Sequence, residues 1–224
     1  MRDFDKFIKN IEQHLLFEEF IDKDEIMNYI RRFIDYQLMI NVIDEEGLFE
    51  NQQIVDLIND EDWDKDPTNY FNSLKKSKII GYLTNYQVED LSKMKLFKVK
   101  GFDVGYAIEN DGNIVSMYNN TGFKNLGTFL IKSSIKNGGN KLDHFDGFLT
   151  GFYSRFGFIE DKTKREGWND DLASIYWKYE KVNIFDPNFS VYANEINDNN
   201  VYLYRNEIKR YSEGKPDVIF RNII

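Results

Sequence analysis

Apolar positions in the first part of the chain recur with the spacing of helices. Over residues 4–21 and 26–38 they fall mostly three or four positions apart, which predicts two amphipathic helices. A short third helix is predicted over residues 54–58, and Pro67 restarts the chain after an acidic run. Residues 1–75 therefore predict a small helical unit that cannot bury its apolar faces alone.

From about residue 79 the pattern changes to short apolar runs that alternate with helical spacing. Strands are predicted over residues 96–99, 103–108, 114–118, 141–145, 176–182 and 217–220. Helices are predicted over residues 86–94, 126–136, 147–156 and 201–213. The fold class is therefore α/β (α+β), a mixed β-sheet flanked by helices, with residues 1–75 as a helical extension and 76–224 as the main domain.

Two connections set the expected topology of this domain. Asp111-Gly112 lies between two apolar runs, which predicts a two-residue hairpin turn with positive φ at both positions. The alternation of strands and helices after Ile114 needs crossover connections, which predict parallel strands.

Composition narrows the class of protein. The chain has 224 residues, of which 42% are hydrophobic, enough for a sizeable core. Cysteine is absent and the only histidines are His14 and His144, which argues against disulfides, a thiol nucleophile and a histidine-rich metal site. No long apolar run and no leader pattern is present, so we expect a cytoplasmic protein without a membrane span and without a metal.

Charge is distributed unevenly. Residues 1–95 carry 21 acidic and 12 basic side chains, a net charge of −9, whereas residues 96–224 carry 17 of each. Such a field repels phosphate backbones and argues against duplex nucleic acid as a partner. It suits a basic partner protein or mimicry of nucleic acid, although a solvated helical surface is the commoner meaning of such a pattern.

A polar loop with candidate chemistry follows the strand predicted at 114–118. It contains Gly122 and Lys124 and opens a helix at Leu126. The first turn of a helix has unpaired amides and the positive end of the dipole, so this loop can hold a pyrophosphate. Gly127 permits close approach and Lys124 adds a positive charge, but a steric glycine and a solvated lysine are the simpler interpretations.

The helix predicted at 147–156 ends in Phe152-Tyr153-x-x-x-Gly157-Phe158. With the preceding loop, helix and strand, it resembles the GNAT superfamily of N-acetyltransferases. That family has an Arg/Gln-x-x-Gly-x-Gly phosphate loop, then a helix, a strand and a helix that ends in Tyr-x-x-x-Gly-Phe. Residues 141–158 and 214–220 look still more like a GNAT-like group of bacteriophages and mobile elements. The resemblance covers about residues 96–160 and 214–221.

The resemblance implies an acetyl-coenzyme A-dependent N-acyltransferase that transfers the acyl group directly to an amine, in the host cytoplasm if the gene belongs to a phage. It implies Tyr153 as the general acid that returns a proton to the coenzyme A thiolate. The residues implied to bind the cofactor lie on the strand end, the loop and the helices: Met117, Asn119, Gly122, Lys124, Asn125, Gly127, Thr128 and Asp146. Gly122 and Asn125 depart from the family motif, which puts affinity for acetyl-coenzyme A in doubt.

Attack by an amine also needs a general base. The candidates are Asp143 and His144, and strand alternation places them on opposite faces. His144 is preferred, because an unperturbed histidine titrates near pH 6.5. Structural roles compete with each assignment: Tyr153 as a packed aromatic, His144 as a hydrogen-bonded core residue and Asp146 as a helix cap.

Other functional classes are open or disfavoured. A catalytically inactive GNAT-like protein that binds a host protein through its acidic helical region is the main alternative, motivated by the altered loop and by the −9 charge. A virion component has no positive feature, and a hydrolase is disfavoured because no Gly-x-Ser-x-Gly motif or metal-ligand cluster is present. The amine acceptor, whether a protein, a small molecule or a nucleic acid component, is not defined by the sequence.

Overall fold

The computed structural model describes residues 60–121, 126–170 and 183–223. The chain divides into two units, residues 1–49 and 50–224, so every described residue belongs to the second unit. The helices expected over 4–21, 26–38 and 54–58 and the strand expected over 176–182 lie outside the described residues.

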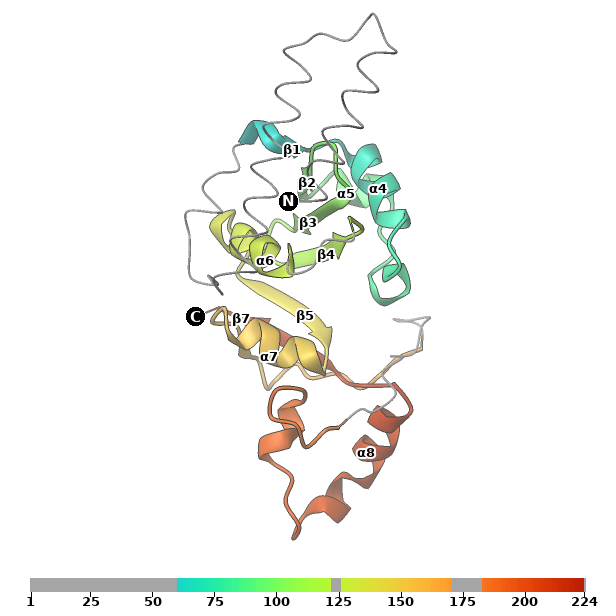
Figure 1. Cartoon of the computed structure of the whole chain (residues 1–224), viewed down its shortest axis with the longest axis vertical. Coiled ribbons are helices and arrows are strands. Elements are labelled where there is room, and N and C mark those ends of the chain that lie inside the picture. The colour runs from blue at the N-terminus through green and yellow to red at the C-terminus, as the bar shows by residue number, and fades with distance from the viewer. Residues whose placement is uncertain (1–59, 122–125, 171–182, 224) are drawn as a thin grey trace, which may run out of the picture. The chain divides into compact units, whose positions relative to one another are not determined.

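The first sheet of the described residues has four antiparallel strands in the order β1-β2-β3-β4 (Figure 1). They are β1 (Trp63–Asp64), β2 (Lys95–Val99), β3 (Val104–Ile108) and β4 (Ile114–Asn119). The α-helices are α4 (Pro67–Lys75), α5 (Val88–Leu91), α6 (Leu126–Lys136), α7 (Phe148–Ser154) and α8 (Arg205–Ser212). The short 3-10 helices are η1 (Asp60–Asp62), η2 (Ile80–Tyr82), η3 (Val191–Asn194) and η4 (Val201–Tyr204). The expected strands at 96–99, 103–108 and 114–118 and the expected helix at 126–136 are confirmed.

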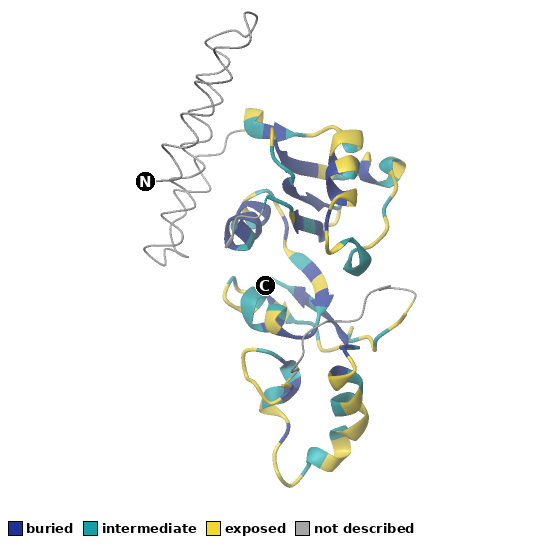
Figure 2. Ribbon diagram, turned by 45° about the vertical axis from the view of Figure 1, so that its right-hand side comes forward, coloured by how far each residue is buried: buried dark blue, intermediate teal, exposed yellow. Residues whose placement is uncertain are grey.

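Both faces of the first sheet are covered by helices, which explains why its strands are buried almost throughout (Figure 2). Ala107 of β3 packs in a cluster with Tyr70 and Leu74 of α4. Its neighbour Tyr106 faces the other way and its hydroxyl bonds Ser133 Oγ of α6 at 2.8 Å. Because α4 supplies core residues, the division between the units comes earlier than the boundary expected after residue 75.

The hairpin between β3 and β4 forms, but its turn differs from the expected one. The Gly112 N–H donates to Glu109 O at 3.0 Å, and φ is +88° at Gly112 but not positive at Asp111. The turn therefore closes from Glu109 to Gly112 with glycine in the last position, and the expectation of two positive φ angles is wrong.

The second sheet of the described residues has three strands in the order β5-β7-β6. They are β5 (Lys141–Phe145), β6 (Ile159–Glu160) and β7 (Val218–Asn222), and both outer strands are antiparallel to β7. The expectation that the strands after Ile114 run parallel holds at the bridge between Asn113 and Lys141. It is wrong for the strands expected at 141–145 and 217–220, which pair antiparallel as β5 and β7. The short strand β6, which the sequence did not predict, has the same direction as β5, and β7 lies between them. The structure is thus mixed α+β, with two antiparallel sheets in place of the single mixed sheet expected.

The segment between β6 and β7 contributes η3, η4 and α8. Its small core contains Ile184, Tyr192, Ile196 and Tyr211, and much of α8 is exposed (Figure 2). None of the helices in the described ranges has the length and apolar character needed to span a bilayer.

Candidate functional site

The strands β4 and β5 begin together and then separate. Asn113, just before β4, forms a parallel bridge with Lys141 at the start of β5. Beyond this bridge the two strands, both fully described, belong to different sheets. Helix α6 follows β4 after a short loop. The carboxyl-terminal halves of β4 and β5 therefore do not form backbone hydrogen bonds with each other.

A β-bulge interrupts β4 next to this separation. Ser116 and Met117 together oppose Tyr106, because the pairing shifts between Gly105 and Ala107. Ser116 has φ of 51°, a strained value for a residue other than glycine. Its carbonyl accepts a hydrogen bond from Tyr70 Oη at 2.8 Å, whereas its buried Oγ has no hydrogen-bond partner among the described residues. An unsatisfied buried hydroxyl and backbone strain at one position are typical of functional sites.

The predicted cofactor contacts on β4 lie where the sequence placed them. Met117 is half-buried and packs against a buried cluster that includes Ile114, and Tyr153 packs against the same cluster. Asn119 ends the strand, and its Oδ1 accepts hydrogen bonds from the backbone and hydroxyl of Thr121. The backbone of Met117 therefore lies at the bulge of β4.

At the start of α6, Gly127 has no structural reason to be glycine. A Cβ added there would meet Phe152 Cζ at 3.5 Å, an ordinary contact, and the residue has no positive φ. Packing therefore leaves room for another group to approach the backbone at this position. The side chain of Thr128 is buried. The predicted contacts Gly122, Lys124 and Asn125 lie outside the described residues.

Tyr153 of α7 is packed among rings but has no hydrogen bond. Its ring centroid lies 5.2 Å from that of His144 and 6.1 Å from that of Phe158. Its hydroxyl has no hydrogen-bond partner among the described residues. Burial, and then the charge of Asp143, raises the pKa of Tyr153 to about 12. Tyr153 therefore stays protonated at neutral pH, as a general acid must.

His144 is buried in β5 and both of its ring nitrogens are occupied. Nδ1 lies 2.8 Å from Phe145 O, and Nε2 accepts a hydrogen bond from Arg221 Nε at 3.0 Å. These bonds require the neutral ring with its proton on Nδ1. Burial lowers the pKa of His144 to about 3, and the positive charge of Arg221 acts in the same direction. This geometry does not support His144 as the general base, because no lone pair is left for a substrate proton.

Asp143, the other candidate base, lies on the opposite face of β5 and reaches solvent. The surrounding protein withdraws its carboxyl from water and thereby raises its pKa, and repulsion from Glu109 and Glu166 adds to the effect. Glu109 is held in place by Tyr86 Oη at 3.1 Å and by Asn113 Nδ2 at 2.9 Å. A carboxylate with a raised pKa that water can reach is a better proton acceptor than the enclosed His144.

Asp146 is enclosed by protein groups instead of facing a cofactor. It is 1% exposed and accepts hydrogen bonds from Thr150 Oγ1 at 2.6 Å, Ser190 Oγ at 3.0 Å, Tyr211 Oη at 2.6 Å and Val191 N at 3.2 Å. Both oxygens are engaged, so the structure does not support the expected cofactor contact. Asp146 anchors α7 through the Thr150 hydroxyl and does not cap a backbone amide of that helix.

Asp217 has a similar environment and extends the same network. Its carboxylate accepts hydrogen bonds from Tyr192 Oη at 2.7 Å, from Arg165 Nε at 3.1 Å and from Arg210. The positive charge of the arginines is thereby neutralised within the segment that precedes β7. No motif in the sequence signalled this cluster, because Ser190 and Tyr211 follow Asp146 by 44 and 65 positions.

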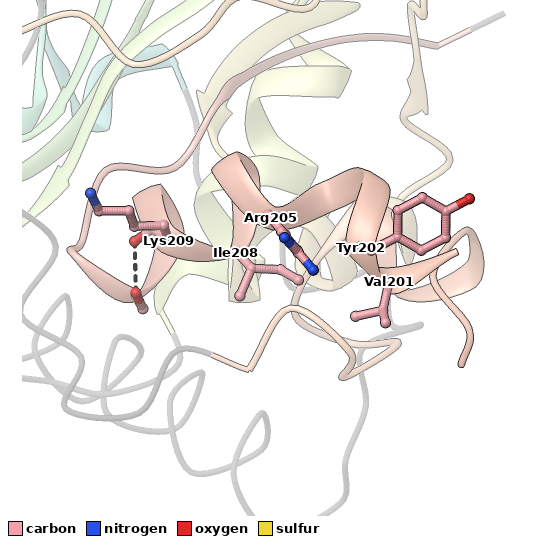
Figure 3. Close-up of a pocket in the computed structure, with 6 residues that line it drawn as sticks. Val201, Tyr202, Arg205, Ile208 and Lys209 are labelled. Carbon is pink, nitrogen blue, oxygen red and sulfur yellow. Dashed lines mark hydrogen bonds between the residues drawn. The ribbon is translucent and has the colours of Figure 1, made fainter. Parts of the chain in front are cut away.

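A pocket lies elsewhere, on η4 and α8 (Figure 3). It is lined by Val201, Tyr202, Arg205, Ile208, Lys209 and Ser212, and Ser212 Oγ donates to Lys209 O within it. It contains none of the predicted site residues and no acid–base pair that resembles Tyr153 and Asp143. In the described ranges, no three His, Asp or Glu side chains are placed to hold a metal ion.

No family model matches the chain, and comparisons with curated proteins and with solved structures find no match. The functional assignment therefore depends on the geometry of the site.

Proposed function

We propose that the protein is an acetyl-coenzyme A-dependent N-acyltransferase with a GNAT-like fold, which acts in the cytoplasm. One observation carries the proposal: β4 and β5 start as a parallel pair and then separate, and Tyr153 packs against His144 of β5 and against a buried cluster that includes Ile114 of β4. A thioester cofactor needs this combination of free strand backbone, helix N-terminus and proton donor.

Two features of the described residues fit acetyl-coenzyme A. The Ser116 hydroxyl at the bulge is an unsatisfied buried polar atom, and Gly127 leaves room at the helix start that packing does not require. Backbone groups of Met117 would bind the pantetheine arm, and amides at the start of α6 would bind the pyrophosphate. Gly122, Lys124 and Asn125 belong to the same proposed binding loop. When bound, the cofactor supplies an acetyl group activated as a thioester.

The reaction then needs two proton transfers, one to and one from side chains of the chain. The amine nitrogen forms a bond to the acetyl carbon, and the carbon–sulfur bond breaks. Asp143 is the proposed acceptor of the proton that the amine loses, because its raised pKa makes it a stronger base than an ordinary aspartate. It lies on the face of β5 opposite His144 and Tyr153, so the proton would reach it through a water molecule. Tyr153 donates its proton to the departing sulfur. The products are an acetylated amine and a free thiol.

The charges near Asp143 support an amine as the acceptor. Glu109 and Glu166 both act on the Asp143 carboxyl, and none of the three is in an ion pair among the described residues. A positively charged amine is attracted to such a site before it loses its proton. Lysine side chains and small amines are therefore the acceptors to test first.

A binding role without catalysis is the second candidate. It is supported by the net charge of −9 over residues 1–95 and by the departures at Gly122 and Asn125 from the phosphate-loop motif. A host protein bound through exposed charges would be released as ionic strength rises. A complex that resists salt, or an absence of any complex, contradicts this alternative.

Thermal unfolding in the presence of acetyl-coenzyme A tests the leading proposal. At about 100 times its dissociation constant, the cofactor is expected to raise the free energy of unfolding by about 2.7 kcal/mol. An unchanged melting temperature up to millimolar cofactor contradicts the proposal. Mass analysis of lysate proteins and amines for a 42-dalton acetyl adduct, about the mass of the transferred group, then identifies the acceptor.

A further inference from the structure

Arg221 of β7 is a buried cation whose hydrogen bonds all go to neutral groups; Glu160, its register partner on β6, and Asp146 attract its charge without forming an ion pair with it. It is 4% exposed and donates to His144 Nε2 at 3.0 Å, to Ser154 Oγ at 2.8 Å and to Phe158 O at 2.8 Å. All three acceptors are neutral, and no ion pair involves Arg221 among the described residues. Burying a charge costs free energy unless the charged group is hydrogen-bonded. The three groups that accept hydrogen bonds from Arg221 therefore indicate what this residue holds in place.

The three partners surround Tyr153. The His144 ring lies 5.2 Å from the Tyr153 ring, Ser154 is the next residue of α7, and the Phe158 ring lies 6.1 Å from that of Tyr153. One guanidinium thus ties together β5, the end of α7 and the start of the following strand. Tyr153 is located at the point where these elements meet.

We propose that Arg221 and His144 are positioning residues for Tyr153. Arg221 fixes the end of α7 and, with Phe145 O, holds the His144 ring by both nitrogens. The His144 ring in turn packs against the Tyr153 ring, with the centroids 5.2 Å apart. The catalytic meaning of this arrangement rests on the function proposed above, whereas the positioning itself does not.

The Tyr153 hydroxyl explains why neighbouring residues must hold Tyr153 in position. Because this hydroxyl has no hydrogen bond in the described residues, only packing determines where it points. A displacement of about 1 Å in a reacting group can cost about a hundredfold in rate. The His144 imidazole, held by a hydrogen bond at each ring nitrogen, therefore limits displacement of Tyr153 and keeps kcat from falling.

Fluorine NMR of the full chain labelled with 3-fluorotyrosine tests the positioning without any assay of activity. The Tyr153 resonance is identified by its loss in Tyr153→Phe. His144→Phe keeps a ring but removes both nitrogen bonds, and Arg221→Met removes the guanidinium. Both variants are expected to shift or split the Tyr153 resonance.

Arg210→Met is the matched control, because Arg210 binds Asp217 and is not bonded to a neighbour of Tyr153. It is expected to leave the Tyr153 resonance unchanged. If Arg221→Met does not fold, Arg221→Lys retains the charge with fewer donors and is expected to shift the resonance less. A Tyr153 resonance that is unchanged in both His144→Phe and the folded Arg221 variant overturns the proposal.

Kinetics separate this proposal from the function on which it rests. Arg221→Met is expected to lower kcat about a hundredfold without changing the KM for acetyl-coenzyme A. Unchanged kcat in this variant contradicts the positioning role while the enzyme assignment stands. If the wild-type protein neither binds nor uses acetyl-coenzyme A, the function fails, and the NMR result still decides whether Arg221 and His144 position Tyr153.

Discussion

Two groups of polar side chains, each brought together from distant parts of the sequence, differ in how far their hydrogen-bonding capacity is satisfied. In the saturated cluster, formed by Asp146, Asp217 and their donors, each carboxylate oxygen accepts at least one hydrogen bond. In the open group, Ser116, Tyr153 and Asp143, the Ser116 hydroxyl is buried without a hydrogen-bond partner, the Tyr153 hydroxyl is not hydrogen-bonded and the carboxylate is in no ion pair among the described residues. The comparison teaches that satisfaction, and not residue type, separates a structural aspartate from a chemical one.

The largest expected effect is on the saturated cluster. Asp146→Ala leaves the hydroxyls of Ser190 and Tyr211 without their acceptor and removes a charge close to Arg165. We expect the free energy of unfolding, measured by urea denaturation, to fall by about 3–5 kcal/mol. Asp111→Asn, which breaks an exposed ion pair with Lys141, is the control and should change stability little. Equal stability of the two variants contradicts the structural role of Asp146.

Replacing one tyrosine by phenylalanine in the saturated cluster and one in the open group compares the contribution of each hydroxyl. Tyr211→Phe removes a hydroxyl bonded to Asp146 and is expected to lower the free energy of unfolding by about 1–3 kcal/mol. Tyr153→Phe removes an unbonded hydroxyl, so stability should stay within about 0.5 kcal/mol while kcat falls about a hundredfold. Urea denaturation and steady-state kinetics measure the two effects. Unchanged turnover in Tyr153→Phe removes Tyr153 from the mechanism.

The dependence of kcat/KM on pH tests whether Asp143 is the general base. A base must be deprotonated to act, so the rate should rise with pH as Asp143 loses its proton, at a pH above the usual value for aspartate because its pKa is raised. Tyr153, with a pKa of about 12, stays protonated over this range and adds no upper limb. Asp143→Asn should remove the acidic limb, and Glu109→Gln should move it to lower pH by removing repulsion. A profile that Asp143→Asn leaves intact assigns the base elsewhere.

The smallest expected effect concerns the start of α6. Gly127→Ala adds a methyl group in ordinary contact with Phe152, so the fold should be equally stable or more stable, by up to about 1 kcal/mol. If the pyrophosphate approaches this position, affinity for acetyl-coenzyme A should fall about tenfold, or 1.4 kcal/mol, by calorimetry. Gly139→Ala is the contrasting glycine, because its Cβ would lie 2.5 Å from Ile114 and should destabilise the fold. Unaltered affinity in Gly127→Ala argues against a pyrophosphate there.

Local elements of the fold were predictable from the sequence, and long-range ones were not. The helix α6 and the strand β5 follow from spacing within a few residues, and their predicted bounds are confirmed. The two-residue strand β1 has no pattern of its own and forms only because β2 pairs with it. The insertion of β7 between β5 and β6 depends on residues far along the chain, so the crossover rule wrongly predicted β5 and β7 to be parallel.

The site shows the same limit. Tyr153 was chosen from a local motif, and its role stays a prediction; the structure packs it against His144 and against the same buried cluster as Met117. The expectation for His144 relied on the pKa of an exposed histidine, and the residue that occupies its free nitrogen, Arg221, is 77 positions away. No local pattern distinguishes an aspartate that is later saturated, such as Asp146, from one that stays open, such as Asp143.

The central place of β7 in its sheet affects how the protein matures during synthesis. β5 and β6 pair only with β7 in that sheet, so neither has a partner strand there until residues 218–222 have left the ribosome. Arg221 arrives with the same strand. The first sheet can fold while the chain is still being made, whereas the surroundings of Tyr153 are completed only after β7 has been synthesised.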